Sequence, residues 1–221
     1  MAHKIDWKTV WLLIGMFVVT LLIWHTPFMF FNKAFTVFWH EVGHGTGAVL
    51  TGGSIESITL SPELGGLCTY RGGWQTLILP AGYLGSFLFG SLIIIGAAKT
   101  NKDKYISMFL GVVMALITVF FVRSVFGWAV GLGFAAVLFL LGWKAPEKVN
   151  DIALKYLGLT STMYAVIDIY DDLISRTIEG SDAYAMSELW FGPPIMWGVL
   201  WMLFAIVGSF FVLRTAVRVK Q

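Results

Sequence analysis

The sequence predicts an all-α polytopic membrane protein of about seven transmembrane helices, with one short β-hairpin between two of them. Three observations predict this fold. Hydrophobic residues make up 57% of the 221 residues and charged residues 13%, which is about half the charged share of a soluble domain. Uncharged runs long enough to cross a bilayer recur along the chain. One polar segment, 54–71, has no helical period. We expect a single membrane-embedded domain over residues 1–221, in a multi-pass integral protein.

The first two helices are marked by their ends. The apolar run Val10–Trp24 is not followed by the small residues of a signal-peptide cleavage site, so we expect it to be a retained helix. The pair Thr26-Pro27 is typical of a helix start and predicts a second helix that continues to about Thr51. Two glycines at 52–53 then end it.

The polar segment that follows is predicted to form two short strands and a turn. Ile55, Ile58 and Leu60 precede a Ser-Pro-Glu turn at 61–63. Leu67 and Tyr70 lie beyond a Gly-Gly pair at 65–66. Apolar residues near every second position, on both sides of turn residues, are typical of a β-hairpin.

The rest of the chain is predicted to be helical. Four uncharged runs have spanning length, and a further helix begins at Ala145-Pro146 and ends at an acidic cluster, 168–172. The four runs are Trp74–Ala98, Tyr105–Val122, Ser124–Trp143 and Phe191–Leu213.

The membrane orientation is left open, because two arguments conflict. Lys4 and Lys8 favour a cytoplasmic N-terminus. A seven-span count puts more basic residues on the face opposite to the N-terminus, which favours the reverse orientation. These residues are Lys99, Lys102, Lys104, Lys144, Lys148, Lys155, Arg214, Arg218 and Lys220.

The motif His-Glu-x-x-His at residues 40–44 carries the chemistry. From composition, roughly 0.002 matches are expected by chance. In a helix, His40 and His44 lie on one face and can bind one Zn²⁺ together. Glu41 lies about 100° around the helix, where it can take a proton from the attacking water as general base. For the glycines at 43, 45 and 47, close helix packing explains the pattern at least as well as a direct catalytic role.

A third protein ligand is needed to complete a hydrolytic zinc site. Asp168 is the first choice, because acids at the end of an apolar helix are costly unless paired or metal-bound. His44 and Asp168 each lie about seven residues before the end of a helix that runs in the same direction, which places them at similar depth. Asp171, Asp172 and Asp182 remain alternatives. The acidic cluster could instead pair with nearby basic residues, and Asp182 could simply cap a short helix.

Several segments in order resemble the M50B-like peptidase family, which is related to the site-2 intramembrane zinc proteases. They are residues 40–44, 50–53, 58–62, 71–73 and 80–85, followed by 168–176 and 181–183. The resemblance implies a membrane-embedded M50-like zinc metalloprotease domain in which a re-entrant hairpin follows the motif helix. It also implies that the third ligand is an Asp of a later helix. The Leu-Asp-Gly and Asn-Pro pattern of site-2 proteases is missing here, so Asp168 is assigned by position and chemistry.

The leading functional hypothesis is an intramembrane zinc endopeptidase that hydrolyses peptide bonds of membrane-protein or peptide substrates within the lipid bilayer. A proteolytically silent M50-like scaffold or metal-binding protein is the alternative. Glu41 favours the enzyme, because metal binding alone needs only the ligands. A transporter would spread polar residues over several spans. Nothing in the sequence resembles a nucleic-acid-binding patch.

Overall fold

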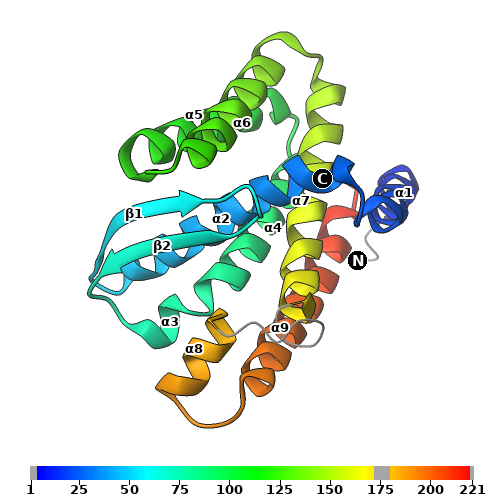
Figure 1. Cartoon of the computed structure of the whole chain (residues 1–221). Coiled ribbons are helices and arrows are strands. Elements are labelled where there is room, and N and C mark those ends of the chain that lie inside the picture. Colours follow the sequence, from blue (N-terminus) through cyan, green and yellow to red (C-terminus); the bar gives the residue numbers. More distant parts are fainter. Residues whose placement is uncertain (1–3, 172–179, 220–221) are drawn as a thin grey trace.

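The computed structural model describes residues 4–171 and 180–219, as a mainly helical chain with one two-stranded antiparallel sheet (Figure 1). The predicted all-α membrane architecture with a β-hairpin after the motif helix is confirmed in outline. The elements are α1 (Trp7–Ile23), the 3-10 helix η1 (Pro27–Met29), α2 (Phe30–Leu50), β1 (Ser54–Leu60), β2 (Gly66–Arg71), α3 (Gln75–Ile78), α4 (Ala81–Lys99), α5 (Asp103–Phe121), α6 (Val125–Lys144), α7 (Glu147–Tyr170), α8 (Asp182–Leu189) and α9 (Pro194–Ala216).

Five of the described helices are long and apolar enough to cross a bilayer: α4, α5, α6, α7 and α9. Helix α1 is apolar but has 17 residues. Helix α2 has 21 residues, but it carries Lys33, two histidines and Glu41 and is not among the five. These lengths and compositions are those of a multi-pass membrane protein. The predicted count of about seven spans is not confirmed.

The helix predicted from Trp74 to Ala98 is two helices. Helix α3 ends at Ile78, and α4 begins after Pro80. A proline has no backbone N–H to continue the hydrogen-bond ladder, so the helix is interrupted there. The interruption has a consequence for the site, because the carbonyl of Ile78 receives a side-chain hydrogen bond from α2.

Glycines let α4 pack closely between α2 and α7. A Cβ added at Gly85 would lie 2.8 Å from the Cα of Gly43, where α2 crosses α4. On the other side of α4, a Cβ at Gly90 would lie 2.7 Å from the carbonyl oxygen of Gly158 in α7. The prediction of close helix packing is confirmed for Gly43 and Gly47, which meet Ala81 of α4, whereas Gly45 packs against Ile55 and Cys68 of the hairpin.

The hairpin lies against α2 and the link between α5 and α6 (Figure 1). Its register pairs Ile58 with Cys68 and Leu60 with Gly66. The outer edge of β1 is occupied: the Arg123 N–H donates to the Ile58 carbonyl at 2.9 Å, and the Leu60 N–H donates to a serine hydroxyl of the same link at 2.9 Å. The other edge of the sheet belongs to β2, which borders the site described next.

Candidate metal centre

Helix α2 brings two imidazoles together, as the i, i+4 spacing predicts. The rings of His40 and His44 have centroids 4.8 Å apart, and their Nε2 atoms lie 3.1 Å apart. His44 is 7% exposed, and the side chain of His40 is 13% exposed. Two ring nitrogens therefore point at one shared, largely enclosed position.

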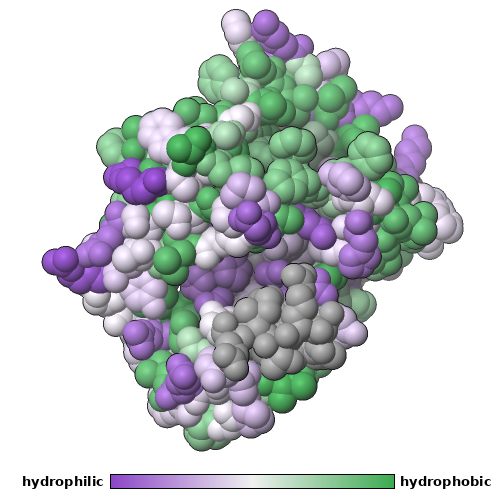
Figure 2. Space-filling model, in the orientation of Figure 1, coloured by the Kyte–Doolittle hydropathy of each residue, from purple (hydrophilic) through white to green (hydrophobic). Residues whose placement is uncertain are grey.

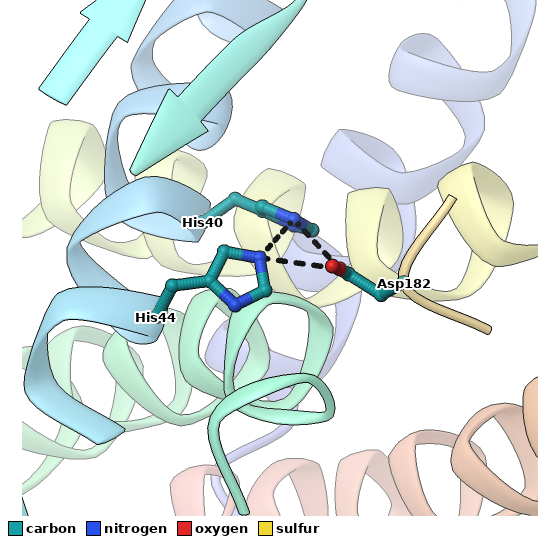
Figure 3. A group of neighbouring side chains, drawn as sticks. All are labelled: His40, His44 and Asp182. Carbon is teal, nitrogen blue, oxygen red and sulfur yellow. Dashed lines mark hydrogen bonds and ion pairs between the residues drawn. The ribbon is translucent and has the colours of Figure 1, made fainter. Parts of the chain in front are cut away.

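Asp182 supplies a third atom directed at the same position. Its Oδ2 lies 3.2 Å from the Nε2 of His40 and 3.2 Å from the Nε2 of His44 (Figure 3). Asp182 is the first residue of α8, and Ser181 is the N-cap whose hydroxyl accepts from the N–H of Tyr184. Since Ser181 caps the helix, the carboxylate of Asp182 is free to face the histidines.

Packing holds α8 in this position. Ala183 and Met186 are buried in a cluster with Tyr83 of α4 and Trp201 of α9. At the far end of α8, the indole N–H of Trp190 donates to a threonine hydroxyl of α3 at 2.9 Å. Both contacts hold α8 against α3 and α4, which also contact the two imidazoles.

The three atoms fit a zinc ion. Bonds of about 2.0–2.2 Å in a tetrahedral site put neighbouring ligand atoms about 3.3 Å apart. The Nε2, Nε2 and Oδ2 atoms are separated by 3.1–3.2 Å. Two histidines and one carboxylate, with a fourth position open, also form a ligand set used by hydrolytic zinc enzymes. Among the described residues, this is the group of His, Cys, Asp and Glu side chains that could hold a metal ion.

A backbone contact orients one of the two imidazoles. The Nδ1 of His44 lies 2.8 Å from the carbonyl oxygen of Ile78, which accepts its proton. A histidine that donates from Nδ1 keeps the lone pair of Nε2 for the metal. The Nδ1 of His40 is buried and has no hydrogen-bond partner within the part of the chain that the structure describes.

Glu41 lies under the hairpin, close to His40, His44 and Asp182. It is 4% exposed, and its carboxylate accepts a hydrogen bond from the backbone N–H of Cys68. A Cβ at Gly66 would lie within 2.7 Å of the side chain of Glu41, so any larger residue there would require the Glu41 carboxylate to move. The Cys68 thiol is not suited to nucleophilic chemistry, because burial and the nearby Glu41 raise its pKa to about 12.

The group of His40, His44 and Asp182 opens into a cavity of about 570 Å³, within the usual size range of ligand-binding pockets. Figure 2 shows hydrophilic side chains recessed beside the hairpin, in a surface that mixes hydrophilic and hydrophobic residues. The wall combines the edge of β2 with residues of α2, α4, α7 and α8. Asp168, Asp171 and Lys33 lie on this wall, and the Lys33 ammonium lies 4.9 Å from the ring centroid of Trp24.

The structure therefore gathers His40 and His44 with Asp182, one of the alternatives to Asp168 that the sequence leaves open. Asp168, the first choice from sequence, lines the same cavity but is not part of the three-residue group. Depth along a helix was the basis for choosing Asp168, and depth does not fix which wall of a cavity a residue occupies. Asp172 lies outside the described residues.

A glycine that sequence reasoning did not single out as part of the site closes it from the side of α4. A Cβ at Gly82 would lie 2.5 Å from the Nε2 of His40 and 2.6 Å from the Cε1 of His44. The sequence signal for this glycine is its place two residues after Pro80, because a proline can interrupt a helix there.

We expect Gly82→Ala to lower zinc affinity at least 10-fold, because the methyl group would displace the ligand rings. The matched control is Gly96→Ala on the same helix, where the new Cβ would meet the flexible end of Ile106 at 3.2 Å. Both substitutions replace a glycine of α4 by alanine, which favours the helix by at most about 1 kcal/mol. Zinc titration of the two purified variants separates the effects; equal affinities would show that Gly82 does not shape the metal centre.

Comparison with known families gives a match over most of the chain. The family model described as Peptidase M50B-like matches residues 13–212. Comparison with curated proteins and with solved structures gave no match. The matched range includes the motif helix, the hairpin, the acidic end of α7 and Asp182. With its two histidines and an aspartate converging beneath a β-hairpin, this chain belongs to the M50B-like peptidase family.

Proposed function

We propose that the protein is an intramembrane zinc metallopeptidase that hydrolyses peptide bonds of membrane-protein substrates. The observation that carries the proposal is the convergence of His40, His44 and Asp182 with a general base, Glu41, at the same cavity. A site built only to store metal would not need a buried carboxylate beside the ligands. Burying such a group is costly unless it has a role or a partner.

The proposed ligands are His40, His44 and Asp182, each with one atom. A zinc ion held there would acidify a bound water and polarise the substrate carbonyl. Glu41 accepts the proton of the attacking water, and the Cys68 N–H holds its carboxylate in place. The same carboxyl group then returns the proton to the leaving amine. Tyr83, whose ring lies edge-on to His40 at a centroid distance of 4.8 Å, restricts the motion of that imidazole.

The hairpin has a strand edge to which an unwound substrate could bind. A helix hides its peptide bonds, so a substrate must be extended at the cut. One edge of the sheet is occupied by the α5–α6 link, and Gly66, Cys68 and Tyr70 of β2 line the cavity along the other edge. An extended segment that adds to β2 as a further strand would pass over Glu41 and would satisfy backbone groups that lipid cannot.

The proposal is tested by metal content and cleavage together. Protein purified in detergent without chelators is expected to contain about one zinc ion per chain and to cut an unfolded protein substrate. A chelator should stop cleavage, and added Zn²⁺ should restore it. The cut sites are identified by mass spectrometry.

The silent-scaffold alternative predicts a different result. A protein that holds zinc in stoichiometric amount but cuts neither an unfolded protein nor a single-span membrane substrate would support a metal-binding scaffold. Absence of zinc after such a purification would contradict both the ligand set and the mechanism.

A further inference from the structure

The segments next to the two ends of the described chain pair with each other (Figure 1). The N–H of Val219 donates to the carbonyl of Lys4 at 2.9 Å. The end of α4 joins them, because the Lys99 ammonium donates to the carbonyl of Arg218 at 2.7 Å. Lys4 and Lys99 therefore lie on the same face of the helical bundle, whereas a count of seven spans puts them on opposite faces.

Three helix starts form a cavity together with these segments. Helix α1 begins at Trp7, α5 at Asp103 and α7 at Glu147. These three residues line a cavity of about 740 Å³, and Lys4 and Arg218 lie on its wall as well. We call it the terminal cavity. Because a helix dipole puts partial positive charge at the N-terminus, three helix starts add to the positive potential of this space.

The acidic side chains of the terminal cavity are engaged within the protein. Asp6 caps α1 by accepting hydrogen bonds from two backbone N–H groups. Glu147 accepts from the N–H of Asp103, which is itself only 2% exposed. Asp151 forms an ion pair with Lys155 at 2.6 Å. These acids therefore leave the other basic residues of the cavity without compensation.

Four basic side chains of the terminal cavity lack an acidic partner. Lys4, Lys8, Lys148 and Arg218 form no ion pair within residues 4–171 and 180–219. Lys8 and Lys148 also lie in the first turns of α1 and α7, where a positive charge opposes the helix dipole. An anion bound in the cavity would offset this repulsion at both helix starts.

The terminal cavity lies at the level of a membrane–water interface. Helix α4 ends there, and α5 and α7 begin there, and all three have the length and composition of membrane spans. Trp7 on the cavity wall is 61% exposed, and Trp11, about one turn further along α1, is 66% exposed. Tryptophan rings concentrate where the hydrocarbon meets the headgroups, so the cavity lies where lipid phosphate groups are found.

We propose that the terminal cavity binds an anionic phosphate group through Lys4, Lys8, Lys148 and Arg218. A phosphate presents several acceptor oxygens, which suits ammonium and guanidinium donors that come from separate segments. Bound there, it joins the chain ends to the starts of α1 and α7 and stabilises the folded chain. The terminal cavity shares no lining residue with the metal cavity, so the proposal does not depend on the proposed peptidase function.

The test measures ligand binding to the full chain, purified in detergent and freed of bound lipid. Three probes are compared. Short-chain phosphatidylglycerol carries an anionic phosphate on acyl chains, short-chain phosphatidylcholine carries a phosphate whose charge is cancelled, and glycerol 3-phosphate carries an anionic phosphate without acyl chains. The unfolding temperature at increasing ligand concentration gives the dissociation constant of each probe.

We expect phosphatidylglycerol to raise the unfolding temperature by several degrees and to bind at least 10-fold more tightly than phosphatidylcholine. Binding of phosphatidylglycerol without glycerol 3-phosphate would identify a lipid headgroup as the ligand. Equal binding of these two would identify a soluble phosphate ester. Equal binding of phosphatidylcholine and phosphatidylglycerol would overturn the proposal, and so would the absence of binding by all three probes.

Substitutions separate a defined site from diffuse surface charge. Lys8→Gln and Lys148→Gln should each weaken phosphatidylglycerol binding about 5-fold. Lys102→Gln is the matched control, since Lys102 is exposed at the same end of the bundle but does not line the cavity. At physiological salt it should change binding by less than about 2-fold. Equal losses in all three variants would overturn the site. A cooperative unfolding transition without ligand confirms that each variant folds, and Lys4→Gln replaces one that does not.

Discussion

Replacing Glu41 with glutamine is expected to abolish peptide hydrolysis while leaving the zinc content near that of the wild type. The amide keeps the shape of the side chain but cannot accept a proton from water, and general-base catalysis contributes about 10²–10⁴-fold to such reactions. Zinc should remain because the three proposed ligand atoms belong to His40, His44 and Asp182. The measurements are the cleavage rate and metal content of the same preparation.

A control at a second carboxylate makes this result specific. Glu63 also lines the cavity but is exposed in the hairpin turn, so Glu63→Gln should leave cleavage within a few-fold of the wild type. Full activity in Glu41→Gln would exclude Glu41 as the base. Loss of zinc in Glu41→Gln would indicate that Glu41 holds the metal, directly or through a neighbour.

The parts of the fold that the sequence predicted are those set by local chemistry. Apolar run length placed the helices, and Gly-Gly pairs with a Ser-Pro turn placed the hairpin within residues 54–71. The i, i+4 spacing fixed the two histidines on one face of α2. The interruption at Pro80 was missed, because Leu79 and its neighbours are apolar enough to read as one continuous span.

The identity of the third ligand could not be predicted from local sequence patterns. Periodicity and helix depth describe position along an axis, but the partner of two histidines is chosen by lateral packing between helices. The sequence leaves Asp182 open as an alternative ligand, but the pair Ser181-Asp182 at the start of a short helix favours a helix cap. In the structure Ser181 supplies the cap, and Ala183 and Met186 pack α8 so that Asp182 faces α2. A helix start needs only one capping residue. The presence of both Ser181 and Asp182 therefore indicated that one of them could have another role.

The choice between the two aspartates has a large and measurable consequence. Asp182→Ala is expected to lower zinc affinity by well over the 10–100-fold that loss of a group outside the ligand shell costs, because it removes one of three protein ligands. The α8 helix should persist, since Ser181 is retained as its cap. Asp168→Ala is the matched control: it removes the same group from another wall of the same cavity and should keep zinc.

Zinc content by mass spectrometry and competition with a chelator of known affinity would decide between the two residues. Zinc lost in Asp168→Ala and kept in Asp182→Ala would return the third ligand to α7. Loss in both variants would mean that the wall carrying Asp168 is required to hold Asp182 in place. In that case Asp168→Asn, which keeps the volume and most hydrogen bonds, should restore binding if the role of Asp168 is positional, and should not if its charge binds the metal.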